Sequence, residues 1–145
     1  PNLPDAGAVG RAAAAMNAPG FLIEEMVTGT VAELLIGVIR DPHGWLLTLA
    51  AGGTATEIWR DSQSLLLPVT EADVLSALDR LRLAPLLHGW RGAPGADPAA
   101  IVRAVLAVQD YVAATPDLAE VEVNPLLCGP AGAVAVDALI RKETQ

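Results

Sequence analysis

The chain has 145 residues, of which 52% are hydrophobic and only 3% aromatic. This length suits a single domain whose core is built from aliphatic side chains. The 17 acidic residues outnumber the 9 basic ones, giving a net charge of −8 without any basic cluster, and this composition argues against a nucleic acid as partner.

The single cysteine, Cys128, excludes a disulfide framework and a thiolate metal site. No apolar run reaches the length of a membrane span without a charge or a turn, and the first residues do not have the pattern of a signal peptide. We therefore expect a globular domain in the reducing cytoplasm, with no membrane partner.

The first part of the chain predicts one helix followed by strands. The alanine-rich stretch Ala6–Met16 favours a short helix. Four stretches then have the composition of strands: Phe21–Val27, Glu33–Arg40, Trp45–Ala51 and, as a candidate, Thr54–Arg60. Asp41-Pro42-His43-Gly44 has the composition of a tight turn, so antiparallel pairing is the economical arrangement.

The middle of the chain predicts a helix over Glu71–Leu81, preceded by an extended stretch over Leu65–Pro68. Thr70 is a candidate N-cap, and Asp73 follows it at the spacing of a capping box. Val74, Leu75, Leu78 and Leu81 recur at helical spacing and form one apolar face.

A loop over Leu86–Pro98 leads to the second helix, Ala99–Ala114. Asp97 is expected to cap this helix, with Pro98 at its first position. Strands, two helices and a final strand hairpin indicate an α+β domain with an antiparallel sheet and helices packed on one face.

The final hairpin, Val121–Asp137, carries the clearest chemistry. Glu122 and Asn124 are two residues apart, so on a strand they project from the same face. If the Gly129-Pro130-Ala131-Gly132 turn is centred between Pro130 and Ala131, Asn124 lies opposite Asp137.

Three oxygen-bearing side chains, Glu122, Asn124 and Asp137, would then meet on one patch. Hard oxygen donors of this kind suit Mg²⁺ held together with substrate phosphates rather than zinc. In the alternative interpretation, Asn-Pro begins a turn and the two acids are solvated residues at strand ends.

The EVNPL run at residues 122–126 and the AVDALI run at 135–140 resemble the end of the ATP-grasp domain in the NDP-forming acyl-CoA synthetases. This family includes the ADP-forming acetate–CoA ligases and is related to the β subunit of succinyl-CoA synthetase. The resemblance implies that Asn124 and Asp137 bind the Mg²⁺ of the Mg–nucleotide, with Glu122 as an accessory or water-mediated ligand.

Three further segments carry the resemblance. LIEEMV resembles the hinge whose backbone meets the adenine edge, which implies nucleotide-binding positions at Glu24, Glu25, Met26 and Val27, and Glu33 resembles the acid that binds the ribose hydroxyls. Two more segments resemble the family pattern, AAGGTATEIWRD and LLHGWRGAPGADPAA. The residues of this chain that fall on the pattern are Gly52, Gly53, Glu57, Asp61, Gly89, Arg91, Gly92 and Asp97.

The resemblance implies that residues 1–145 form one domain, the C-terminal half of an ATP-grasp fold. By this resemblance, the front half, which brings the phosphate-covering lysine, and the CoA-binding domains are expected to lie outside these residues. The implied role is to bind Mg–ATP or Mg–ADP in an enzyme that ligates a carboxylic acid to CoA through acyl phosphate and phosphohistidine. This half supplies no catalytic residue, is expected to be inactive alone, and needs the remainder of the synthetase in cis or as a second subunit.

Two rival functions remain at this point. One is a regulatory or ligand-sensing domain attached to a lysine acetyltransferase, and the other is a degenerate interaction domain. The joint presence of Glu122, Asn124 and Asp137 speaks against the second, because an abandoned metal site has no physical need for all three.

Several single residues have two interpretations. His43 and His88 fit solvated turn and surface positions better than a catalytic role. Gly52-Gly53 either lets backbone N–H groups approach a phosphate or forms a bend. Arg91 either reaches a phosphate or CoA, or ties down its own loop. The three tryptophans are expected to pack rather than stack on a ligand.

Overall fold

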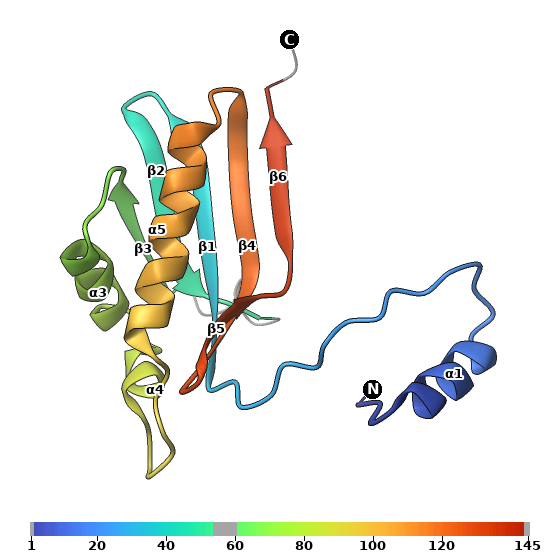
Figure 1. Cartoon of the computed structure of the whole chain (residues 1–145). Helices are drawn as coiled ribbons and strands as arrows, with labels where there is room; N and C mark the ends of the chain where they lie inside the picture. Colours follow the sequence, from blue (N-terminus) through green and yellow to red (C-terminus); the bar gives the residue numbers. More distant parts are fainter. Residues whose placement is uncertain (1, 54–60, 144–145) are drawn as a thin grey trace.

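The computed structural model describes residues 2–53 and 61–143. It contains a six-stranded sheet with helices α3, α4 and α5 on one side, while α1 lies apart at the end of an extended linker (Figure 1). In chain order the elements are α1 (Ala6–Ala15), β1 (Ala32–Asp41), β2 (Gly44–Ala51), β3 (Ser62–Leu66), α3 (Glu71–Asp79), α4 (Ala84–His88), α5 (Pro98–Ala114), β4 (Leu118–Gly129), β5 (Gly132–Ala135) and β6 (Ala138–Lys142).

The strand order is β3-β2-β1-β4-β5, and every pairing is antiparallel. Strand β4 is long enough to pair with two strands along the same edge. Its C-terminal part pairs with β5, and its N-terminal part pairs with β6. The predicted α+β architecture with an antiparallel sheet is therefore confirmed.

The core lies between the sheet and the helices. Alternate residues of β1, such as Leu34 and Ile36, are buried on the helix side, as the period of two in a strand requires. Helix α5 buries Ile101 and Val105, and α3 buries Val74, in the same cluster. The other face of the sheet carries no helix in the described part of the chain, and we call it the open face (Figure 1).

Helices α3 and α5 begin where the sequence predicts. The Thr70 side chain accepts a hydrogen bond from the Asp73 N–H, and the Asp73 carboxylate accepts one from the Thr70 N–H, which completes the capping box. Asp97 accepts a hydrogen bond of 2.9 Å from the Ala99 N–H, and Pro98 is the first residue of α5.

The predicted strand over Phe21–Val27 is wrong. The segment between α1 and β1 has no regular secondary structure and is exposed over most of its length, with Leu22 83% and Ile23 70% accessible. A strand needs a neighbouring strand to satisfy its backbone groups. No strand of the described chain pairs with this segment. Its apolar composition alone therefore misled the prediction.

Smaller differences concern two short elements that the sequence did not predict and the ends of others. Helix α3 ends at Asp79 rather than at Leu81. Helix α4 includes the first residues of the predicted loop over Leu86–Pro98. Strand β4 begins at Leu118, before the start of the predicted hairpin at Val121. Strand β6 is an additional strand that follows the hairpin. The candidate strand over Thr54–Arg60 lies outside the described residues. No helix in the described chain is long and apolar enough to cross a membrane.

Candidate functional site

The hairpin of β4 with β5 and β6 has the predicted register. Leu126 pairs with Ala135 on one side of Asn124, and Val123 pairs with Ala138 on the other. Asn124 lies between them, and its backbone N–H donates a hydrogen bond of 3.2 Å to the Asp137 carbonyl oxygen. Asn124 and Asp137 are therefore directly opposite each other.

Asn124 and Glu122 lie side by side on the open face. The amide nitrogen of Asn124 donates a hydrogen bond of 3.3 Å to Oε1 of Glu122. Val121 and Val123, the residues that alternate with Glu122, are buried on the helix side. This hydrogen bond turns the amide nitrogen toward the carboxylate, so Oδ1 of Asn124 is the atom left to face a cation.

A β-bulge explains how β4 places these groups. Its register with β1 shifts between Leu34 and Ile36, opposite the Asn124-Pro125 step. As a result, buried residues occur at Val123 and next at Leu126, and both Asn124 and Pro125 stay half-buried. Bulges commonly redirect side chains next to functional sites.

The donor set fits Mg²⁺ by its chemistry. One amide and two carboxylates are hard oxygen ligands, and Asp137 is exposed while Asn124 and Glu122 are half-buried. Within the described residues, no three His, Cys, Asp or Glu side chains gather into a ready-made metal cage. A site that takes part of its ligands from a nucleotide phosphate and water is the arrangement that Mg²⁺ usually adopts.

Glu33, the predicted ribose ligand, lies on the same open face as Glu122 and Asn124. It pairs with Leu127 across β1 and β4, one strand away from the metal-ligand candidates, and is exposed. Strand β2 ends beside it, because the Gly52 N–H donates a hydrogen bond of 2.7 Å to the Glu33 carbonyl oxygen. The Gly52 N–H is therefore already paired within the protein.

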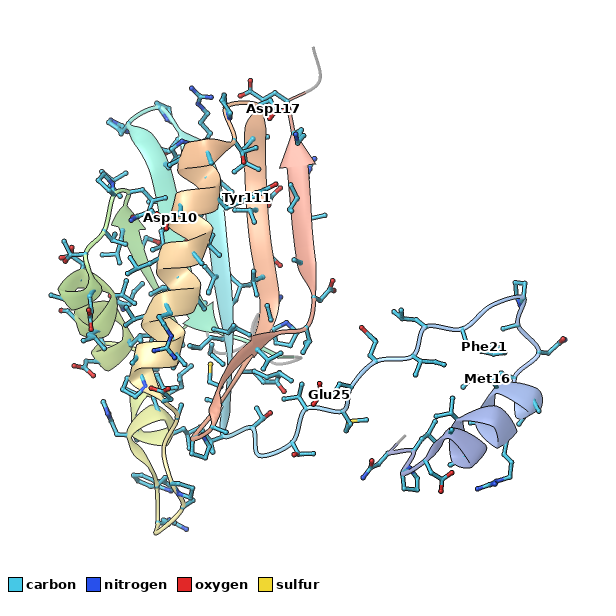
Figure 2. All side chains as sticks on the ribbon, viewed as in Figure 1. Met16, Phe21, Glu25, Asp110, Tyr111 and Asp117 are labelled. Carbon is cyan, nitrogen blue, oxygen red and sulfur yellow. The ribbon has the colours of Figure 1, made fainter. Side chains whose placement is uncertain are left out.

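The predicted hinge residues line a groove against strand β5. Glu24, Glu25, Met26, Val27 and Thr28 form one wall of a space of about 600 Å³, and the other wall is formed by Val134, Ala135 and Val136. Figure 2 shows Glu25 on the linker that leads to the sheet. Since Val136 immediately precedes Asp137, this groove adjoins the three metal-ligand candidates.

Close backbone contacts hold the end of the linker against the hairpin. The Val31 N–H donates a hydrogen bond of 2.8 Å to the Cys128 carbonyl oxygen. A Cβ on Gly129 would lie 2.6 Å from the Gly29 carbonyl oxygen, so only glycine allows this approach. The residues that carry the family resemblance did not include Gly129. The signal available in the sequence was its place as the first residue of the predicted hairpin turn.

Two acids of the matched segments have structural roles. Asp61 is buried, and its carboxylate accepts hydrogen bonds from the Arg82 N–H at 2.8 Å and the Leu83 N–H at 3.0 Å. Asp97 caps α5, and its own N–H donates to the Gly129 carbonyl oxygen at 2.9 Å. The sequence alone predicted that Asp97 caps α5, but it did not predict that Asp61 is buried.

The histidines and Arg91 lie outside this group. In the exposed turn between β1 and β2, the His43 backbone N–H donates a hydrogen bond of 3.0 Å to Asp41 Oδ1, and His43 Nδ1 lies 2.9 Å from the same oxygen. Both contacts lower the pKa of Asp41. His88 Nε2 lies 2.9 Å from Asp79 Oδ1 on the surface. Arg91 lies over the Trp90 ring, 5.7 Å from its centroid.

Comparison with known proteins identifies the family. The family model that describes the ATP-grasp domain matches residues 6–141 of this sequence. The β subunit of acetate–CoA ligase [ADP-forming] I from Pyrococcus furiosus is 30% identical over 107 residues, which cover 73% of this chain and 46% of that protein. A trans-feruloyl-CoA synthase from an unknown prokaryotic organism is 36% identical over 128 residues, which cover 86% of this chain and 18% of that protein. The chain thus spans about half or less of the curated relatives it matches.

Solved structures agree with this result. Dinucleotide forming acetyl-coenzyme A synthetase 1 from Ca. Korarchaeum cryptofilum, in complex with coenzyme A and acetyl-coenzyme A, superposes with a TM-score of 0.81 at 29% identity, covering 99% of this chain and 69% of that one. The same protein with coenzyme A and Mg-AMPPCP gives a TM-score of 0.75 at 31% identity, covering 81% and 55%. The chain therefore belongs to the ATP-grasp domain family, in the group that includes the ADP-forming acetate–CoA ligases.

Proposed function

We propose that this chain is the nucleotide-binding half of the ATP-grasp domain of an NDP-forming acyl-CoA synthetase, and that it binds Mg–ADP or Mg–ATP on the open face of its sheet. The observation that carries this proposal is the register of the hairpin. It sets Asp137 opposite Asn124, which is hydrogen-bonded to Glu122, next to the groove of the hinge residues. Family membership supports this interpretation, because a member of the family was solved with Mg-AMPPCP.

In this proposal different side chains bind different parts of the Mg–nucleotide. Asn124 and Asp137 hold Mg²⁺, and Glu122 acts directly or through water while its hydrogen bond orients the Asn124 amide. Bound Mg²⁺ would neutralise the charge of the nucleotide phosphates during phosphoryl transfer.

The base and the ribose are bound by neighbouring elements. The backbone of Glu24, Glu25, Met26 and Val27 meets the edge of the base in the groove along β5. The Glu33 carboxylate accepts hydrogen bonds from the ribose hydroxyls, for which an acceptor-only group is suited. Gly52 and Gly53 lie beside Glu33 at this end of the site.

The complete enzyme needs parts beyond this chain. We infer that the remainder of the synthetase, in cis or as a second subunit, covers the phosphates and binds CoA and the carboxylic acid. The relatives named above are CoA ligases or synthetases, and this favours the ligase over a sensing domain of a lysine acetyltransferase. Because this half brings positioning and charge but no nucleophile, it is expected to have no turnover alone.

Calorimetric titration of the chain with ADP tests the proposal. We expect weak binding with Mg²⁺ and much weaker binding when EDTA replaces Mg²⁺, because the ligand phosphates then face Glu122 and Asp137 without a cation between them. Equal affinity in the two conditions would contradict the proposed metal site. The same titration with GDP measures the preference for the base.

A further inference from the structure

The glycine pair at the end of β2 contacts Glu33 in two different ways. Gly52 makes a backbone contact: its N–H donates to the Glu33 carbonyl oxygen, and a Cβ on Gly52 would lie 2.9 Å from the carbonyl carbon of Leu34. Such a distance is too short for a side-chain carbon, so only glycine at position 52 lets the end of β2 lie this close to β1.

Gly53 contacts the side chain of Glu33 instead. A Cβ on Gly53 would lie 2.6 Å from Oε2 of Glu33, which is inside van der Waals contact. The φ angle of Gly53 is +87°, a conformation that residues with a side chain seldom adopt. The carboxylate therefore occupies the space that any other residue at position 53 would fill.

We propose that Gly53 is a positioning residue that fixes the orientation of the Glu33 carboxylate for the nucleotide ribose. This inference rests on the proposed function, in which Glu33 binds that ribose. An exposed glutamate on a strand samples several rotamers and loses this freedom when it binds a ligand. Because Gly53 has no Cβ, Oε2 can occupy this space before the ligand arrives, and such preorganisation strengthens binding.

A double-mutant cycle with Mg–ADP as the probe tests this inference. We expect Gly53→Ala to weaken Mg–ADP binding about tenfold, the size of one lost hydrogen bond to a charged group. In the Glu33→Ala background, the same substitution should change the affinity little, because no carboxylate remains to be displaced. Gly44→Ala is the control, since Gly44 also has a positive φ, +138°, but a Cβ there meets nothing within 4 Å.

The outcomes separate this inference from the proposed function. Loss of affinity in Glu33→Ala but not in Gly53→Ala would overturn the positioning role and leave the nucleotide site intact. An equal loss from Gly53→Ala with and without Glu33 would also overturn it, because the effect would not pass through the carboxylate. Unchanged Mg–ADP affinity in Asp137→Ala would instead overturn the proposed metal site.

A second measurement needs no nucleotide. The carboxyl carbon of Glu33 can be followed by carbon-13 nuclear magnetic resonance in the labelled chain. We expect its chemical shift to move in Gly53→Ala and to stay unchanged in Gly44→Ala. An unmoved Glu33 resonance in Gly53→Ala would overturn the inference even if binding to the isolated chain is too weak to measure.

Discussion

The backbone N–H of Asn124 donates a hydrogen bond to the carbonyl oxygen of Asp137 across the hairpin. This bond fixes the two residues opposite each other, and the hydrogen bond from Asn124 to Glu122 adds the third oxygen donor on the same face. A one-residue slip of the register would move Asp137 to the helix-covered face. The register of this hairpin therefore decides whether the proposed metal site can form.

Substitution of Asp137 by alanine should abolish the Mg²⁺-dependent part of ADP binding and leave the fold intact. Asp137 is exposed, so its removal exposes no core surface and leaves no buried charge. Calorimetric titration measures the binding, and thermal unfolding checks the fold. Asp110→Ala is the matched control, because Asp110 is an exposed acid on helix α5, on the other side of the sheet (Figure 2). Equal affinities of the two variants would contradict the metal assignment.

The sequence predicts the hairpin and the starts of helices α3 and α5 well because their signals are local. Alternation on β4, turn residues at 129–132 and capping residues at Thr70 and Asp97 each act within a few residues. The alternation and the turn residues together place Asn124 opposite Asp137 without any knowledge of tertiary structure. The β-bulge at Asn124-Pro125 was not predicted, although it did not disturb this pairing.

The remaining parts depend on contacts between distant segments. The Phe21–Val27 stretch has the composition of a strand, but composition does not show whether a partner strand is present. Asp61 is a buried acid whose carboxylate accepts hydrogen bonds from backbone N–H groups more than 20 residues later in the chain. For the same reason, the contact between Gly53 and Glu33 cannot be read from the sequence, because it joins the ends of two strands.

Substitution of Gly129 by alanine should loosen the linker from the hairpin. The added Cβ would collide with the Gly29 carbonyl oxygen at 2.6 Å, and backbone atoms cannot turn aside as a side chain can. We expect a loss of about 1–3 kcal/mol in the free energy of unfolding, the usual cost of overpacking. Weaker Mg–ADP binding should accompany it, since the hinge residues precede this contact.

Chemical denaturation measures the loss of stability. The amide nuclear magnetic resonance signals of residues 24–31 show whether the linker is loosened, and titration with Mg–ADP measures the binding. Gly20→Ala is the control, because a Cβ at Gly20 meets nothing within 4 Å. If Gly129→Ala and Gly20→Ala leave the stability and the hinge spectra equally unchanged, the linker does not dock on the hairpin as the structure has it.

Substitution of Asp61 by alanine should destabilise the fold without a direct effect on the proposed metal ligands. The Arg82 and Leu83 N–H groups would lose their acceptor, and the Leu83 bond is buried. We expect the free energy of unfolding to fall by about 2–4 kcal/mol. Urea unfolding measures this change. Asp79→Ala, which removes an exposed acid paired with His88, should cost far less, and an equal loss in both would contradict the structural role of Asp61.

Burial raises the pKa of the Cys128 thiol from 9.0 to about 12, which makes the stability fall at high pH. Between these two values the unfolded chain releases the thiol proton while the folded chain keeps it, so the folded state binds more protons. The free energy of unfolding therefore decreases as pH rises above about 9, by up to about 1.4 kcal/mol per pH unit. Below pH 9 the thiol is protonated in both states and contributes no pH dependence.

Urea unfolding of the chain and of Cys128→Ala between pH 7 and about 10.5 tests this expectation. The alanine variant leaves a small cavity and should be less stable at neutral pH, but its stability should fall less steeply above pH 9. Tyrosine and lysine titrate in the same range and contribute equally to both proteins, so the difference between the curves isolates the thiol. Parallel curves would show that Cys128 is open to solvent, which would contradict its place in the core between the sheet and the helices.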